Sequence, residues 1–321
     1  MNDNCLCSLV IRSFNEERHI GVLMEGIKRQ NIYNELEIIV VDSGSTDATV
    51  SIAGSYGAKI VHIEPADFSF GKALNSGCKM AKGKYILFAS AHVYPLYTNW
   101  VEKMIAPFKD EKVALTYGQQ VGNELTKYSE QQLFKKWFPK TSNYHQDIPF
   151  CNNANSAIRK ELWLQQPFDE LLTGLEDLDW ASRIQQKGYH IAYEAFAPIV
   201  HVHEENSSKI RNRYRREAIA LKKIMPSQHL HFLDFFRLTT ANILTDSIHA
   251  LRDHVFLKNI YSIVQFRTMQ FWGTYKGFKQ IGQIDEKLKQ RFYYPNKFKI
   301  RAKQDTEPGE KIIYSSIGSA K

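Results

Sequence analysis

The hydrophobic and polar positions of the first 90 residues follow two alternating patterns. Short apolar runs rich in Val and Ile predict buried strands, and segments with apolar residues three or four positions apart predict amphipathic helices. Because buried β-branched strands separated by helices pair in parallel, this order predicts right-handed crossovers and a doubly wound, mostly parallel α/β sheet. The predicted strands are 7–11, 36–41, 59–63 and 85–89, and the predicted helices are 16–30, 46–56 and 72–81.

Beyond residue 100 the pattern is looser. Helices are predicted at 100–108, 124–137 and 176–187, and strands at 113–120, 152–159, 190–194 and 198–202. A basic helix follows, because residues 209–223 hold seven Lys or Arg and one acid, Glu217. Two aromatic, amphipathic stretches come next. We therefore expect a first domain over residues 1–225 and a mainly helical, basic and aromatic C-terminal region over 226–321.

Composition narrows the class of protein. The 321 residues are 43% hydrophobic and carry a net charge of +8, an ordinary soluble globular composition with a basic bias. Nucleotide phosphates, anionic lipids and acidic surfaces would all account for the charge. Because zinc-ribbon, RNA-recognition and helix-turn-helix patterns are absent, we expect no nucleic acid partner. Four cysteines without a secretion signal, and no apolar run of about 18 residues, predict a cytoplasmic protein with reduced thiols.

A carboxylate stands at the end of the second predicted strand. Asp42 follows the apolar run 36–41, and ligands of open α/β sheets bind outside the carboxyl ends of the strands. The small polar residues that follow are typical of a turn and a helix N-cap. We interpret Asp47 as such a cap and Asp42 as a ligand-binding residue.

Four segments together resemble the family 2 glycosyltransferases of the GT-A fold. They are 10–17 (VIRSFNEE), 41–47 (VDSGSTD), 71–75 (GKALN) and 176–180 (EDLDW). The resemblance covers roughly residues 5–225 and points to rhamnosyltransferase-like bacterial glycan enzymes. It implies an inverting transferase that moves a sugar from a nucleotide-sugar donor to a hydroxyl of a glycan or lipid-linked acceptor in bacterial surface polysaccharide synthesis.

The resemblance also implies a donor site. The nucleoside would be held by Ser13, Glu16 and Asp42, and the donor nearer its phosphates by Lys72, Asn75 and Ser90. A carboxylate accepts hydrogen bonds from a base ring N–H or from ribose hydroxyls, so the residue types fit. Asp42 would accept equally from uracil and thymine, which favours UDP or dTDP and leaves GDP as a third option.

On the acceptor side the resemblance assigns the acid pair Glu176 and Asp177, with Asp177 as the general base. A neighbouring carboxylate raises the pKa of such a base. The two side chains cannot share one helix face, so one acid points at the site while the other orients it or caps the helix. The structural alternative is that both acids occupy the first turn of a helix because the helix dipole favours them there.

The sequence departs from the family pattern at the end of the fourth predicted strand. Where the family holds a divalent metal with an Asp-any-Asp motif, residues 90–92 read Ser-Ala-His. Either His92 replaces a carboxylate as a ligand of a divalent metal, Mn or Mg, although imidazole suits Mg poorly. Or the site is metal-free, His92 donates to phosphate, and cations such as Arg12, Lys72 or Arg159 neutralise the leaving group. Or the chain is a nucleotide-sugar binding module without turnover.

Two further histidines favour a metal. His201 and His203 stand two residues apart in a predicted strand, which puts both rings on one face at a spacing that serves a metal. A structural or solvent-facing pair is the alternative. A nucleotidyltransferase, the other rival function, would show a Gly-rich phosphate loop after the first strand, and residues 13–16 contain no glycine.

The basic and aromatic C-terminal region has two interpretations. Its aromatic faces pack against neighbouring helices, or they enter the interface of an anionic membrane as a peripheral contact at the inner face of the plasma membrane. The sequence leaves the oligomeric state open.

Overall fold

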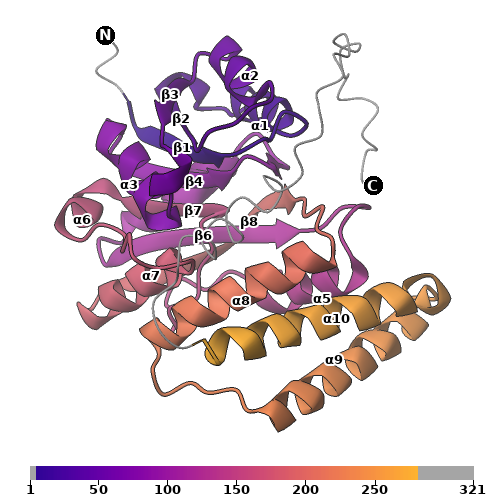
Figure 1. Ribbon diagram of the computed structural model, residues 1–321. Coiled ribbons are helices and arrows are strands. Elements are labelled where there is room, and N and C mark those ends of the chain that lie inside the picture. Colours follow the sequence, from indigo (N-terminus) through magenta and orange to yellow (C-terminus); the bar gives the residue numbers. More distant parts are fainter. Residues whose placement is uncertain (1–4, 281–321) are drawn as a thin grey trace. The chain divides into compact units, whose positions relative to one another are not determined.

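One mixed sheet organises the described part of the chain, residues 5–280, in the computed structural model (Figure 1). Its strands are β1 (Cys7–Ser13), β2 (Leu36–Asp42), β3 (Lys59–His62), β4 (Tyr85–Ser90), β5 (Val93–Pro95), β6 (Val113–Val121), β7 (Asn155–Arg159) and β8 (His190–His201). The spatial order is β3-β2-β1-β4-β7-β6-β8-β5. Strands β3, β2, β1 and β4 are parallel to one another, whereas β7 runs antiparallel to both β4 and β6. The predicted α/β class is confirmed.

Helices pack on both faces of this sheet, and the last helices of the described residues pack mainly on one another. They are α1 (Ile20–Lys28), α2 (Thr49–Ser55), α3 (Phe70–Met80), α4 (Trp100–Ile105), α5 (Tyr128–Trp137), α6 (Lys160–Gln165), α7 (Glu176–Gln186), α8 (Ser207–Ile224), α9 (Phe232–Arg252) and α10 (Phe256–Phe278). Every predicted helix is present among the described residues, and each predicted boundary lies within a few positions of the observed one.

The alternation of β1 explains the two cores. Val10 points into the core beneath α3 and α7, where it belongs to the same cluster as Leu74 and Trp180. Its neighbour Leu9 points to the opposite face, into the cluster that contains Met24 of α1. Successive strand residues face opposite sides of a sheet, so an all-apolar strand requires a helical layer on each side.

The two strands predicted at 190–194 and 198–202 are one strand, β8. Its pairing with β6 shifts register between Gly118 and Gln120, so that the partner of β6 jumps from Glu194 to Ile199. Pro198 lies in this irregular stretch, where a residue without an N–H interrupts no ladder bond. The prediction of two strands was therefore wrong because Pro198 marks a bulge within a strand.

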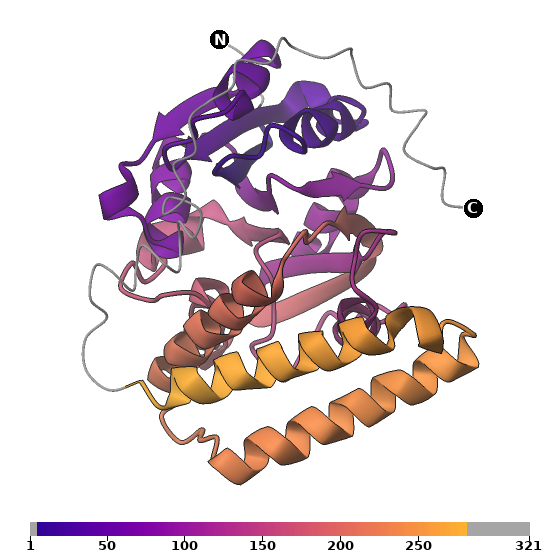
Figure 2. The same ribbon diagram turned by 45° about the vertical axis from the view of Figure 1, so that its right-hand side comes forward.

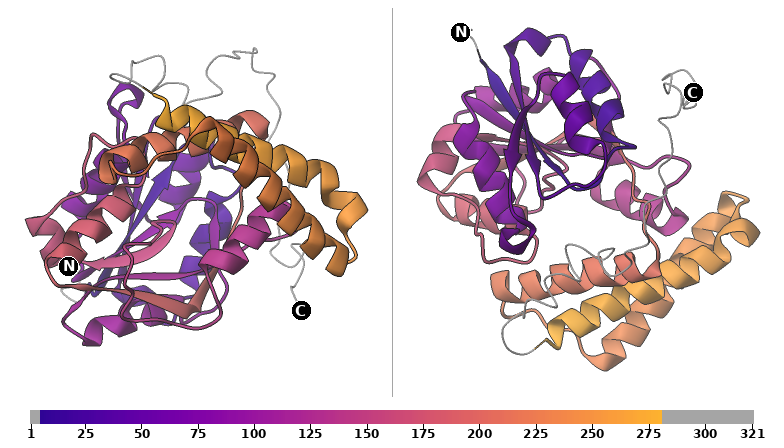
Figure 3. Two further views of the ribbon diagram at one scale, coloured as in Figure 1. Left: turned by 90° about the horizontal axis from the view of Figure 1, so that it is seen from below. Right: turned by 45° about the horizontal axis from the view of Figure 1, so that its top comes forward.

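The C-terminal helices pack closely on one another, and Figure 2 and Figure 3 both show α9 and α10 side by side. Helix α10 crosses α8 at two glycines. A Cβ atom at Gly273 would lie 2.3 Å from the carbonyl oxygen of Arg211, and one at Gly277 would lie 2.5 Å from that of Arg215. The crossing therefore requires glycine at both positions. No helix within residues 5–280 is long and apolar enough to cross a membrane. The predicted domain boundary after residue 225 falls between α8 and α9 and stays a prediction.

Candidate active site

The carboxyl ends of three parallel strands bring the predicted donor residues to one edge of the sheet. Ser13 of β1 is the register partner of Asp42 in β2. On the other side of β1, Arg12 pairs with Ser90 of β4. Three of the residues assigned to the donor, Ser13, Asp42 and Ser90, therefore lie at neighbouring strand ends, where ligands of such sheets bind.

Asp42 is buried and already accepts hydrogen bonds from the turn that follows it. Its Oδ2 accepts from the backbone N–H groups of Gly44 and Ser45 at 3.1 and 3.0 Å, and its Oδ1 accepts from the hydroxyls of Ser45 and Ser13 at 2.5 and 3.3 Å. The carboxylate thus fixes the turn after β2. A nucleoside bound here would share the Asp42 carboxylate with these N–H and O–H groups.

Glu16 is tied to the altered metal motif. Nδ1 of His92 lies 2.8 Å from Oε1 of Glu16. Burial opposes ionisation of Glu16, but the His92 ring, together with His19 and Lys209, outweighs it, so the pKa of Glu16 is lower than usual. The structure therefore places Glu16 behind His92, as the group that orients its ring.

Two residues of α3, Lys72 and Asn75, were assigned to the sugar donor, and their surroundings differ. Lys72 stands in the first turn, and its Nζ is 3.6 Å from the carboxylate of Asp67 at a half-exposed surface. Asn75, by contrast, has no hydrogen-bonding group left for a donor. Its amide N–H groups bond Phe168 O and the Glu170 carboxylate, and its Oδ1 accepts from Trp163 Nε1 and Phe168 N. We therefore assign Asn75 a structural role, and the sequence-based assignment to the donor is corrected.

The acid pair begins α7 and is buried. Burial and the neighbouring Glu176 carboxylate raise the pKa of Asp177 to about 7. The backbone N–H groups of Asn153 and Leu178 donate to its two oxygens at 3.0 and 2.8 Å, which fixes the carboxyl group. The side-chain Nδ2 of Asn153 is buried without a hydrogen-bond partner among the described residues. Asp177 can therefore exchange a proton near neutral pH beside an unused amide donor.

Of the cations proposed for a metal-free site, Arg159 lies elsewhere. Its guanidinium donates to the backbone oxygens of Val113, Phe108 and Asp110, and it joins β7 to the segment before β6. We therefore remove Arg159 from the candidate site. Arg12 does reach the acid pair, because its Nη1 is 3.7 Å from Oε1 of Glu176.

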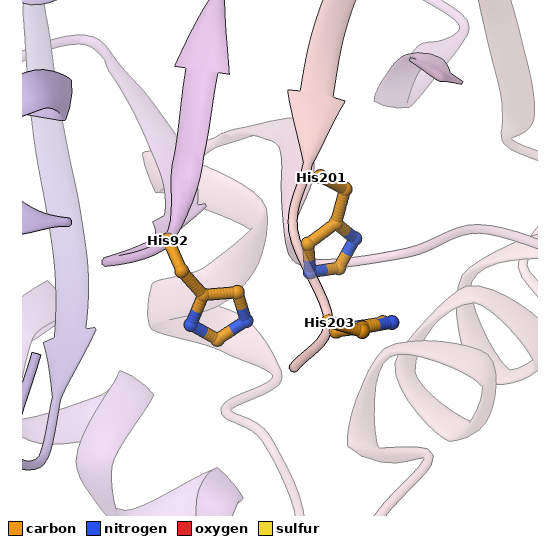
Figure 4. A group of neighbouring side chains, drawn as sticks. All are labelled: His92, His201 and His203. Carbon is orange, nitrogen blue, oxygen red and sulfur yellow. The ribbon is translucent and has the colours of Figure 1, made fainter. Parts of the chain in front are cut away.

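The three candidate metal ligands, His92, His201 and His203, meet at the edge between β5 and β8 (Figure 4). The antiparallel pairing of Val93 with His201 and the hydrogen bond from Val202 N to His92 O bring the two chain segments together. One ring nitrogen of each histidine lies within 4.8 Å of those of the other two. The histidines predicted from distant sequence positions therefore form one cluster.

An oxygen atom holds Nδ1 of each ring in the cluster. His201 bonds Oε1 of Gln120, and His203 bonds Oε1 of Glu130, both at 2.8 Å, while Glu16 holds His92. This leaves Nε2 of each ring for an ion, and Nε2 of His201 is buried without a partner among residues 5–280. Burial and the neighbouring rings lower the pKa of His201 well below its usual range, so this ring is neutral at pH 7, as a metal ligand must be.

Sequence reasoning missed Glu130, which comes from the polar helix α5. Burial opposes its ionisation, but His203 and Arg213 lower the pKa of Glu130 to about 2. An acid in the first turn of a helix is ordinarily explained by the helix dipole, so no local signal distinguishes this one. Gln120, the other orienting group, lies near the end of strand β6, next to a second glutamine, Gln119.

Comparison with known proteins identifies the family. The model of the family described as "Glycosyl transferase family 2" matches residues 8–164. Residues 8–164 therefore belong to glycosyl transferase family 2. The chain is 28% identical over 190 residues to the O-antigen chain rhamnosyltransferase WbaN of Salmonella anatum. That match covers 56% of this chain and 60% of the relative, so the chain spans about three fifths of the length of this curated protein.

Solved structures agree on the fold. A mannosyltransferase from Pyrobaculum calidifontis in complex with GDP-Man and Mn²⁺ superposes with a TM-score of 0.59 at 17% identity, over 84% of this chain and 86% of that one. Residues 1–349 of TarS from S. aureus in complex with UDP-GlcNAc superpose with a TM-score of 0.51 at 16% identity, over 83% and 90%. The expected GT-A fold is confirmed, and the described part of the expected C-terminal region is helical, whereas residues 281–321 of that region lie outside the described residues.

Proposed function

We propose that the protein transfers a sugar from a nucleoside diphosphate sugar, with UDP or dTDP favoured, to a hydroxyl of a glycan or lipid-linked acceptor in bacterial surface polysaccharide synthesis. The observation that carries this proposal is the buried Asp177 carboxyl group, whose pKa of about 7 suits a general base, in a family 2 glycosyltransferase. The Salmonella relative, an O-antigen chain rhamnosyltransferase, supports a deoxyhexosyl donor and a surface glycan.

The proposed reaction is a single displacement. Ionised Asp177 takes the proton of the acceptor hydroxyl, and the oxygen attacks the anomeric carbon. The bond from that carbon to the diphosphate oxygen breaks, its electron pair leaves with the nucleoside diphosphate, and the configuration inverts. The N–H group of Asn153 orients the Asp177 carboxylate, and its unused Nδ2 can donate to an acceptor oxygen.

The histidine cluster fits a divalent ion. His92, His201 and His203 would hold it, because each ring has Nδ1 fixed by an oxygen and Nε2 left over, the arrangement that orients imidazole ligands in metal sites. When bound, the ion supplies positive charge for the leaving diphosphate. Three imidazoles suit Zn²⁺ or Fe²⁺ better than Mg²⁺. Mn²⁺, which the Pyrobaculum mannosyltransferase structure contains, is the third ion to test.

We also propose that the outer face of α9 and α10 rests on an anionic membrane at the cytoplasmic side. Large apolar side chains are exposed along both helices, including Leu233 at 79%, Leu257 at 89% and Tyr261 at 77%. Their buried counterparts Phe235 and Ile263 face the protein. One side of the hairpin of α9 and α10 therefore packs against the protein. The other side exposes apolar side chains, as an interfacial helix requires.

Charge supports a lipid partner for this face. Residues 207–280 contain 13 Lys or Arg and 4 Asp or Glu, whereas residues 1–206 contain 20 Lys or Arg and 25 Asp or Glu, so the C-terminal helices are far more basic than the part of the chain before them. The three acids of the hairpin are all engaged: Asp246 pairs with Arg267, Asp253 accepts from Tyr128, and Asp234 accepts from the backbone N–H of His231. Basic residues beside exposed apolar ones match an anionic bilayer surface.

A screen of nucleotide sugars tests the function. The purified chain is incubated with dTDP, UDP and GDP sugars, with Zn²⁺, Mn²⁺, Mg²⁺ or EDTA, and the release of nucleoside diphosphate is measured. We expect hydrolysis or transfer with one donor class and its loss in Asp177→Asn, while Asp179→Asn on the same helix stays active. Tight donor binding without any turnover would support a binding module. Formation of a nucleoside triphosphate and a sugar 1-phosphate when pyrophosphate is added would support a nucleotidyltransferase. Either result overturns the proposal.

A further inference from the structure

Two arginines from distant parts of the chain stack on one aromatic ring beside the acid pair. Phe70 is the first residue of α3. The guanidinium carbon of Arg12, in β1, lies 4.6 Å from the centroid of its ring, and that of Arg216, in α8, lies 4.5 Å from it. Both distances are within the range of cation–π contacts. Three elements therefore converge to place two positive charges around one ring.

These charges are only partly compensated by the protein. Glu176 is the carboxylate within 4.0 Å of Arg12, and Arg216 has none so close among residues 5–280. Nη1 of Arg12 and Nε of Arg216 are both buried, and neither has a hydrogen-bond partner in this part of the chain. Burial and the nearby Arg216 lower the pKa of Arg12, although Glu176 and Asp177 oppose this. Buried donors that carry charge are costly unless an anion pairs with them.

The position of the pair indicates which anion it meets. Arg12 is the register partner of Ser90 in the altered metal motif and precedes Ser13 on the nucleoside side. Arg216 touches the loop before the acid pair, since its Nε lies 3.4 Å from where a Cβ atom of Gly174 would stand. The pair is therefore next to the base and next to the strand ends assigned to the donor.

We propose that Arg12 and Arg216 bind the diphosphate of the donor and retain its negative charge as the glycosidic bond breaks. This inference rests on the proposed function for the identity of the donor. During transfer the anomeric carbon exchanges its diphosphate oxygen for the acceptor oxygen, and the electron pair of the broken bond stays on the diphosphate. Two guanidinium groups with unused N–H donors suit this charge, because Arg binds phosphate through charge-assisted hydrogen bonds.

Calorimetric titration of the full chain tests the assignment. The ligands are UDP, dTDP, uridine, thymidine and inorganic pyrophosphate, and the variants are Arg216→Gln and Arg216→Lys. The control is Arg215→Gln, which removes a neighbouring cation of α8 whose guanidinium donates to Gln280. Arg216→Gln should weaken diphosphate and pyrophosphate binding by about tenfold or more, because the variant loses a charge-assisted hydrogen bond to the phosphate. Nucleoside binding should not change, Arg216→Lys should retain part of the affinity, and Arg215→Gln should behave as the wild type.

Three results would overturn the inference. Equal weakening of UDP and uridine would show a structural role, and unchanged pyrophosphate binding in Arg216→Gln would show that the pair meets no diphosphate. A raised KM for the acceptor with unchanged UDP and pyrophosphate affinity would assign the anion to a phosphate of the acceptor. Failure of the wild type to bind any nucleoside diphosphate would instead contradict the proposed function, and the pyrophosphate titration would still test the arginine pair.

Discussion

Nδ1 of His203 lies 2.8 Å from Oε1 of Glu130, which joins the histidine cluster to helix α5. The same oxygen accepts a hydrogen bond from Arg213 of α8 at 2.7 Å. A carboxylate that accepts the Nδ1 proton fixes the tautomer of a ligating histidine and makes its Nε2 more basic. The metal affinity of the cluster should therefore depend on Glu130, which does not need to touch the ion.

Substitution of Glu130 by Gln should lower the affinity for Zn²⁺ by roughly 10–100-fold, the usual effect of losing an orienting partner of a metal ligand. Isothermal titration of the metal-free protein measures it directly. Glu204→Gln is the matched control, because it removes an equal charge next to His203 from a side chain that is half exposed. Equal affinities of Glu130→Gln and the wild type would contradict the role of Glu130.

The sequence predicted the first half of the fold well because local pattern determines it. Strand β2 is a run of buried β-branched residues bounded by a turn, and its predicted end at Val41 lies one residue from the observed end. The local pattern does not determine strand direction. Nothing in the sequence of β7 shows that it runs antiparallel to β4 and β6, because that depends on where the long connections lead. Hydrophobic periodicity alone therefore does not predict the mixed sheet.

The sequence likewise predicted one part of the site and not another. Resemblance and spacing brought out His92, His201 and His203, and the structure gathers them. Their orienting partners are not visible in the sequence, because Glu130 is 73 positions from His203 in an unremarkable helix. Asn75 failed in the opposite way. The resemblance assigned it to the donor, but the loop that contains Phe168 occupies its amide group.

The rate of transfer should depend on the ionisation of Asp177. Because its pKa is about 7 and the ionised form is the base, kcat/KM should rise about tenfold per pH unit below pH 7 and level off above it. Asp177→Asn should lower the rate by about 10²–10⁴-fold, the usual contribution of a general base. A pH–rate profile from pH 5.5 to 8.5 with saturating metal measures both. A flat profile in the wild type would rule out Asp177 as the base.

The same carboxyl group should make stability depend on pH. Its pKa is about 7 in the folded chain against the ordinary 3.8, so the native state binds this proton more tightly than the unfolded state. The resulting stabilisation is fully present below about pH 4 and is lost as the pH rises through about 7, up to about 4 kcal/mol. The melting temperature of Asp177→Asn relative to the wild type should therefore increase between pH 5 and pH 8.

Asp179→Asn is the control for this effect. Its carboxylate lies on the same helix and pairs with Arg183 at 2.8 Å. Melting curves of the two variants and the wild type at both pH values isolate the contribution of position 177. A difference between Asp177→Asn and the wild type that stays constant with pH would mean that the Asp177 carboxyl ionises as easily in the folded chain as in the unfolded one.

The hairpin of α9 and α10 should depend on one buried ion pair. Arg267 donates to both oxygens of Asp246 at 2.7 and 2.9 Å, and both side chains are buried. Asp246→Ala leaves the Arg267 charge buried and unpaired, which should cost about 3–5 kcal/mol. Asp246→Leu combined with Arg267→Met should cost much less, because both charges are gone. Urea unfolding of Asp246→Leu, Arg267→Met and the double variant measures the cycle, and an additive double variant would show that the two residues do not interact.

Membrane contact should follow the exposed apolar side of the same hairpin. Sedimentation with vesicles of phosphatidylglycerol should retain the wild type, whereas vesicles of phosphatidylcholine should retain much less, because part of the binding is electrostatic. Leu233→Gln combined with Leu257→Gln should reduce binding to anionic vesicles about tenfold or more, since each removes a side chain that would enter the interface. Leu164→Gln on α6 is the control, because Leu164 is 63% exposed on a different helix. Equal loss of binding in both variants, or equal binding to both lipids, would contradict an anionic membrane as the partner of this face.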